Sequence, residues 1–168
     1  MPGRTRKTTA RRKDESTVSA ATIDREELEA FRATLPDYRR YETYRFLTVH
    51  WDIVRALYLI HKQPRELQPI DVAMFARNYG FFFVEGGAQD DDPPEASGFF
   101  SIDPETVLSN LIDLTRPPLV ALIAADGRER PYAALIDGLH RLFKAAWRGI
   151  SQLPAYVLTP DEVRLCRI

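Results

Sequence analysis

The stretch that most constrains the fold runs from residue 132 to residue 158, with the sequence YAALIDGLHRLFKAAWRGISQLPAYVL. Its apolar start, residues 132–136, is typical of a buried strand, and a polar turn, DGLHR, follows at residues 137–141. Apolar residues then recur at helical spacing up to Gly149, which is placed to end the helix. Residues 153–158 predict another strand. The apolar face of the predicted helix consists of Leu139, Leu142, Phe143, Ala146, Trp147 and Ile150.

The polar turn has the composition of an anion site. Gly138 permits a tight turn and the close approach of a ligand. His140 and Arg141 fall in the first helical turn, where backbone N–H groups without partners and the helix dipole favour negative charge. Arg141, Lys144 and Arg148 recur on the face that we expect opposite the apolar stripe. Cations at this helix end indicate a bound anion, and a phosphate suits a guanidinium group and backbone amides.

These motifs resemble the ParB/sulfiredoxin-like superfamily. The motifs that carry the resemblance are LIDGLHR at 135–141, KAA at 144–146 with Gly149, LPAYVL at 153–158 and TRPPLV at 115–120. The resemblance covers residues 99–168 and implies an α+β fold, with a small mixed sheet packed with helices. Residues 23–98 would form an N-terminal helical extension with an acidic loop, and residues 1–22 a disordered basic tail.

The resemblance also implies a nucleotide site for ATP or CTP, with Mg²⁺ as a candidate companion ion. The residues assigned to nucleotide and phosphate binding are Thr115, Arg116, Gly138, His140, Arg141 and Lys144. Asp137 resembles an acidic residue that some kinase members carry at this turn. Asp137 and His140 are therefore the candidate catalytic residues, and no resident metal site is predicted.

Two features depart from well-known members of the superfamily. Sulfiredoxins need a cysteine inside the turn, where this chain has Leu139, so sulfinic acid reduction is not expected. Chromosome-partition ParB proteins carry a helix-turn-helix domain after this fold, whereas this sequence stops at Ile168, so centromere reading is not expected. The expected function is therefore a nucleotide-binding protein that acts as a nucleotide-dependent switch or a weak NTPase.

Other functions stay open. One is a small-molecule kinase of the free-serine-kinase type, a phosphotransferase that uses Asp137. Another is a DNA-binding or nuclease-like accessory protein, because residues 1–13 hold six basic residues and no acid in a chain of net charge −1. The turn also has a purely structural explanation, in which Asp137 caps the helix, Gly138 serves the turn and Arg141 forms a salt bridge.

Composition sets the broad class. A chain of 168 residues fits one domain with a tail, and a single cysteine fits a reducing compartment. No apolar run approaches the roughly 20 residues of a membrane span, so we expect a cytoplasmic protein without membrane contact. A nucleotide is the expected partner, nucleic acid is an alternative through the basic tail, and a homodimer is left open.

The pattern before residue 99 predicts mainly helices. Asp24 and Glu27 fit a helix start, and Pro36 ends that helix. Residues 37–45, dense in Tyr and Arg, are interpreted as a surface segment, with a patch for base stacking and phosphate binding as the alternative. Residues 51–60 predict a buried helix or a strand leading into one. A further helix is predicted to start at Pro69.

Overall fold

The computed structural model describes residues 22–46, 48–81, 102, 106–107, 112–124 and 129–168. Several predicted features lie outside the described residues. These are the tail at 1–21, residues 82–84 of the strand predicted over 81–84, the loop at 86–98, the strand at 99–100, most of the helix predicted from Asp103, and the hairpin turn at 126–127. Helices and mixed sheets make up the described chain, which confirms the predicted α+β class.

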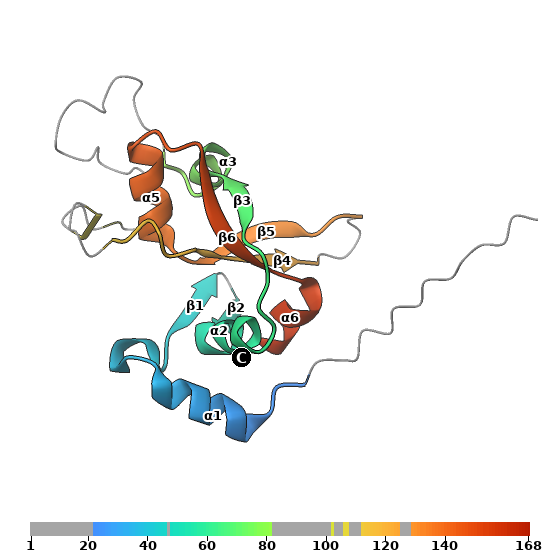
Figure 1. Ribbon diagram of the computed structural model, residues 1–168. Coiled ribbons are helices and arrows are strands. Elements are labelled where there is room, and N and C mark those ends of the chain that lie inside the picture. Colours follow the sequence, from blue (N-terminus) through green and yellow to red (C-terminus); the bar gives the residue numbers. More distant parts are fainter. Residues whose placement is uncertain (1–21, 47, 82–101, 103–105, 108–111, 125–128) are drawn as a thin grey trace, which may run out of the picture.

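A four-stranded sheet organises the fold, in the order β3-β6-β4-β5 (Figure 1). Its strands are β3 (Gln68–Asp71), β4 (Leu119–Ile123), β5 (Tyr132–Asp137) and β6 (Gln152–Leu158). The strand β6 runs parallel to β4 and antiparallel to β3, while β4 and β5 form an antiparallel pair. The expected hairpin pairing and the strand after the helix are confirmed. The sheet also takes β3 from the segment that was predicted as an extension.

Side chains that alternate along the strands fill two apolar layers. Val120 and Leu135 point to the layer that holds α3 (Val72–Asn78) and α5 (Leu139–Trp147). Leu119 and Ala121 point to the layer that holds α2 (Ile53–Lys62) and α6 (Pro160–Leu165). Figure 1 shows these helix pairs on opposite sides of the sheet. The helices therefore fix both faces of the strands that lead into the DGLHR turn.

The helix predicted from Pro69 was placed too early. Residues Gln68–Asp71 form strand β3, and α3 begins at Val72 with the carboxylate of Asp71 accepting a bond from the Met74 amide. Because β3 is an edge strand, the missing N–H of Pro69 is tolerated there. Residues 68–71 therefore form a strand because they lie at the edge of the sheet, a position that the local sequence does not reveal.

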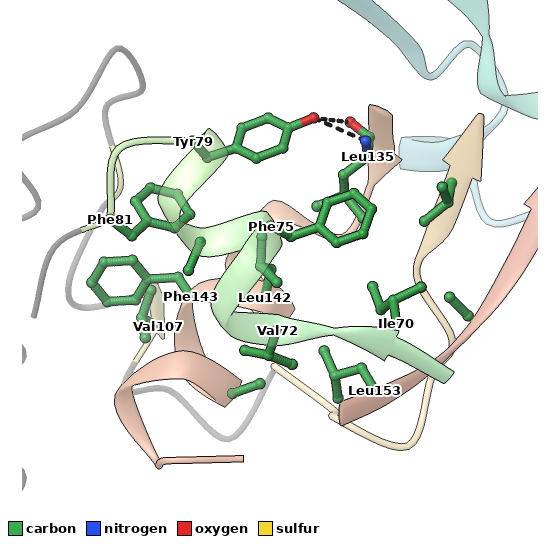
Figure 2. Packing of buried hydrophobic residues seen from close by; sticks show 14 residues of the cluster. Ile70, Val72, Phe75, Tyr79, Phe81, Val107, Leu135, Leu142, Phe143 and Leu153 are labelled. Carbon is green, nitrogen blue, oxygen red and sulfur yellow. Dashed lines mark hydrogen bonds between the residues drawn. The ribbon is translucent and has the colours of Figure 1, made fainter. Parts of the chain in front are cut away.

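The free edge of β5 is covered by a tyrosine from α3. The Tyr79 hydroxyl accepts a bond from the Leu135 amide at 2.9 Å and donates to the Leu135 carbonyl at 3.0 Å (Figure 2). Burial is the main cause that raises the pKa of Tyr79, so the hydroxyl keeps its proton. The register shifts between Leu119 and Val120, one step before β5 reaches Asp137. Bulges of this kind re-aim the side chains beside them.

The N-terminal part comprises α1 (Arg25–Thr34), a short 3-10 helix η1 (Asp37–Arg39), β1 (Thr43–Phe46) and β2 (Val49–Asp52). The predicted cap of α1 is confirmed, because Asp24 accepts a bond from the Glu27 amide. The strand that leads into a buried helix is also confirmed, and Asp52 caps α2. In the part of the chain that is described, no helix has the length and apolarity to cross a membrane.

The predicted apolar face of α5 is largely confirmed. Leu142 and Phe143 lie in the core (Figure 2). Leu139, Ala146 and Ile150 pack against it. Trp147 is half-buried and lies outside that cluster. The prediction that a cationic face lies opposite the apolar stripe is wrong at Lys144, which is buried, with 4% of the residue exposed.

Candidate functional site

The DGLHR turn lies at a pocket of about 180 Å³. Three segments that are distant in sequence supply its walls: the η1 region, residues 112–116, and the end of β5 with the start of α5. The described lining residues are Tyr38, Arg39, Glu42, Ile112, Asp113, Arg116, Asp137, Gly138 and Arg141. The pocket therefore joins the turn expected from the sequence to a segment that was interpreted as mere surface.

Gly138 is required at this turn for two reasons. Its φ is +104°, a left-handed conformation that side chains disfavour. A Cβ atom added there would also lie 2.7 Å from the Cβ of Pro118 and 3.0 Å from a guanidinium nitrogen of Arg141. Gly149, at the other end of α5, has a φ of +67° but no atom within 4 Å of such a Cβ. Of these two glycines at the ends of α5, Gly138 alone meets both constraints.

The N-terminus of α5 has no side-chain cap. Gly138 occupies the N-cap position, and its carbonyl accepts the first helical bond from Leu142. By contrast α1, α2, α3 and α6 have N-cap residues whose side chains accept amide bonds: Asp24, Asp52, Asp71 and Thr159. The amides of the first α5 turn are therefore available to a ligand at the end of the helix that favours negative charge.

Asp137 is held by two arginines. Its Oδ1 accepts a bond from Arg141 and its Oδ2 accepts one from Arg39, both at 2.8 Å. The carboxylate is 13% exposed, and the two arginine side chains are 11% and 9% exposed. Asp137 therefore does not cap α5, and guanidinium groups cover both of its oxygens. Two guanidinium groups stabilise the charged carboxylate, which makes it a weaker base toward a substrate hydroxyl.

Arg141 also fixes the opposite wall of the pocket. Its Nη1 donates to the carbonyl groups of Arg116 and Pro117, each at 3.1 Å. The salt bridge expected in the structural explanation is present, to Asp137. Arg141 thus links the β5–α5 turn to the segment before β4, and replacing it would disturb the shape of the pocket as well as its charge.

Arg39 was included from the sequence only in the alternative interpretation of residues 37–45 as a patch for base stacking and phosphate binding. Its Nε donates to Glu42 at 2.7 Å and its Nη2 to Asp137 at 2.8 Å. Burial acts to lower the pKa of Arg39, but the two carboxylates outweigh it and raise the pKa, so the side chain stays charged. The density of Tyr and Arg in residues 37–45 was the available signal for this wall.

Arg116 differs from the other two pocket arginines. It is exposed, and it forms no ion pair with a described residue. The neighbouring Asp113 accepts bonds from the amide and hydroxyl of Thr115 at 2.8 and 2.7 Å, and the hydroxyl bond is the main cause that lowers the pKa of Asp113. Arg116 is therefore the guanidinium group best placed to receive an anion.

Thr115, His140 and Lys144, the other predicted site residues, do not line the pocket. The hydroxyl of Thr115 donates to Asp113, and His140 is half-buried. The Nζ of Lys144 donates to the Ile112 carbonyl at 3.0 Å, and burial is the main cause that lowers its pKa. Lys144 thus binds the backbone of the 112–116 wall. Its amino group is not exposed for direct contact with a phosphate.

Four predicted residues come together in the pocket: Arg116, Asp137, Gly138 and Arg141. The carboxylates that line it are Glu42, Asp113 and Asp137. Within the described ranges, no group of three His, Cys, Asp or Glu side chains is arranged to hold a metal ion. Comparisons with protein-family models, with curated proteins and with solved structures found no match to this chain.

Proposed function

We propose that this chain binds a phosphate-bearing ligand in the pocket between η1, residues 112–116 and the N-terminus of α5. The observation that carries the proposal is the meeting of an uncapped helix N-terminus with Arg116, an exposed arginine without an ion pair among the described residues. The pocket carboxylates are already engaged, since Asp137 and Glu42 bind arginines and Asp113 binds Thr115. The described lining has three arginines and three carboxylates, so the preference for an anion comes from the uncapped start of α5 together with Arg116.

The size of the pocket indicates which part of a ligand it receives. Sites that enclose a drug-sized molecule have volumes of roughly 300–1,000 Å³, whereas the described pocket has about 180 Å³. Phosphate groups fit this volume, and the remainder of the ligand would extend beyond it. The resemblance of the turn to the ParB/sulfiredoxin-like superfamily favours a nucleotide such as ATP or CTP, and a nucleotide-dependent switch or weak NTPase as the biological role.

The geometry gives less support to phosphoryl transfer by Asp137. That reaction requires an acid or base positioned at the acceptor hydroxyl, and both Asp137 oxygens accept bonds from arginines. The basic segment on which the nucleic-acid alternative depends, residues 1–13, lies outside the described residues. Binding of a phosphate-bearing ligand is therefore the function that we put forward.

Isothermal titration calorimetry with inorganic tripolyphosphate, ATP, CTP and GTP, with and without Mg²⁺, tests this proposal. Arg116→Ala is the preferred variant because it removes a charge without breaking an ion pair among the described residues. The loss of one charged hydrogen bond should weaken binding about tenfold, or about 1.4 kcal/mol. The melting temperature should barely change.

Arg148→Ala is the matched control. Arg148 is an exposed arginine at the opposite end of α5 and does not line the pocket. Its replacement should leave affinity within about twofold of wild type. The proposal is wrong if folded wild-type protein binds none of these ligands, or if both arginine variants lose affinity equally. Release of inorganic phosphate from the bound triphosphate would then distinguish a weak NTPase from a switch without turnover.

A further inference from the structure

A large aromatic side chain stands exposed at the pocket. Tyr38 lines the pocket, yet it is 76% exposed. A tyrosine ring has a large apolar surface, and such rings in contact with solvent are common where a partner is bound. The next residue, Arg39, also lines this pocket and binds Asp137 there. An aromatic surface and phosphate-binding groups therefore occur together.

The backbone that carries Tyr38 is firmly held. The Arg39 amide donates to the Pro36 carbonyl at 2.9 Å, and the Arg40 guanidinium donates to the Leu35 carbonyl at 3.0 Å. The Ile53 amide at the start of α2 donates to the Glu42 carbonyl at 3.0 Å. These bonds fix the segment on both sides of the ring. A ring on a fixed backbone loses less conformational freedom when it binds a flat partner.

We infer that Tyr38 is a stacking surface for the base of a nucleotide whose phosphates lie at Arg116 and the start of α5. This inference rests on the proposed function and extends it from phosphate-bearing ligands in general to nucleotides. The small pocket volume leaves the base outside the phosphate site, next to an exposed ring. Stacking tolerates any base because every base has a π-face, so Tyr38 adds affinity for nucleotides without selecting one.

The chain provides a close control in Tyr41. This residue is 78% exposed, close to the 76% of Tyr38, and lies three positions further on, but it does not line the pocket. Its ring instead lies beneath the guanidinium carbon of Arg32, 5.3 Å from the ring centroid. Replacement of Tyr41 therefore removes an exposed ring from the same segment without changing the pocket lining.

The test compares the affinities of wild type, Tyr38→Ala and Tyr41→Ala for CTP, ATP and inorganic tripolyphosphate, measured by calorimetry. Loss of the stacked base should weaken nucleotide binding about tenfold in Tyr38→Ala. Tripolyphosphate has no base, so its affinity should be unchanged. Tyr38→Phe should retain nucleotide affinity and Tyr38→Leu should lose it, because only an aromatic ring stacks. Tyr41→Ala should match wild type for all ligands.

The outcomes separate this inference from the proposed function. Equal nucleotide affinities in wild type and Tyr38→Ala, with tripolyphosphate binding that still depends on Arg116, would overturn the stacking role and leave the phosphate site intact. Equal losses for tripolyphosphate and nucleotides in Tyr38→Ala would also overturn it, because the ring would then shape the phosphate site. Absence of binding by tripolyphosphate and nucleotides alike would overturn both proposals.

Discussion

Two arginine–carboxylate clusters in this molecule lie beside helix N-termini, but they differ in whether the carboxylate caps the helix. At Glu162, Arg65 donates to both carboxylate oxygens, at 2.6 and 2.8 Å. The Thr159 amide also donates to this carboxylate, which completes the capping box of α6. Burial alone would raise the pKa of Glu162, but the bonds from Arg65 and Thr159 outweigh it and lower the pKa. This cluster satisfies its own helix terminus.

The Asp137 cluster leaves its neighbouring helix terminus open. Asp137 accepts bonds from the side chains of Arg39 and Arg141, but no side chain caps the backbone amides at the start of α5. A pocket lies directly beside this cluster, and a third arginine, Arg116, stands there without an ion pair to a described residue. Both clusters are charged, so charge alone does not indicate a site. The Asp137 cluster is the candidate because the α5 amides and Arg116 beside it are available to a ligand.

The largest effect on stability is expected at the Glu162 cluster. Glu162→Ala leaves Arg65 without its carboxylate and removes the capping box, so it should lower the free energy of unfolding by about 3–4 kcal/mol. Urea denaturation measures this loss. Ligand affinity of the folded fraction should be unchanged, because Glu162 does not line the pocket. A loss below about 0.5 kcal/mol would mean that the closed cluster is not structural.

The next prediction compares Gly138 and Gly149, the two glycines with positive φ at the ends of α5. Gly138→Ala combines an unfavourable φ with a Cβ contact of 2.7 Å to Pro118, so we expect a loss of about 2–3 kcal/mol and a distorted pocket. Gly149→Ala has the unfavourable φ but open space, so it should cost about 1 kcal/mol. Thermal or urea unfolding of both variants measures the difference. Equal losses would show that the contact with Pro118 does not constrain the turn.

A smaller effect than that of Gly138→Ala tests the role of Asp137. Asp137→Asn should cost about 1–2 kcal/mol of stability, because the amide keeps one acceptor oxygen for the arginines and replaces the other with an NH2 group that cannot accept a bond. It should also raise the affinity for tripolyphosphate about fivefold at low salt, because Arg39 and Arg141 lose a competing negative charge. Glu162→Gln is the control and should leave affinity unchanged. Weaker binding in Asp137→Asn would instead support direct participation of the carboxylate, as the kinase alternative requires.

The sequence predicted one wall of the pocket directly and gave the other only as an alternative interpretation of residues 37–45, for a physical reason. Residues 137–141 are contiguous, so local turn and helix patterns were sufficient to bring Asp137, Gly138 and Arg141 together. Arg39 meets Asp137 across 98 positions of sequence, a contact that only tertiary packing creates. Lys144 has the spacing of an exposed helical residue, but the Ile112 carbonyl holds it in the interior. Local periodicity does not reveal that Arg39 binds Asp137 or that Lys144 binds the Ile112 carbonyl.

The most direct test of the anion site is a titration with inorganic pyrophosphate, followed by NMR of backbone amides and arginine Nε–H groups. We predict saturable shifts at the Leu139, His140 and Arg141 amides and at Arg116. Arg65, in the closed cluster, should stay unchanged and provides an internal control. Shifts that spread equally over exposed arginines, or no shift at the start of α5 at millimolar pyrophosphate, would contradict the assignment of this pocket as a phosphate site.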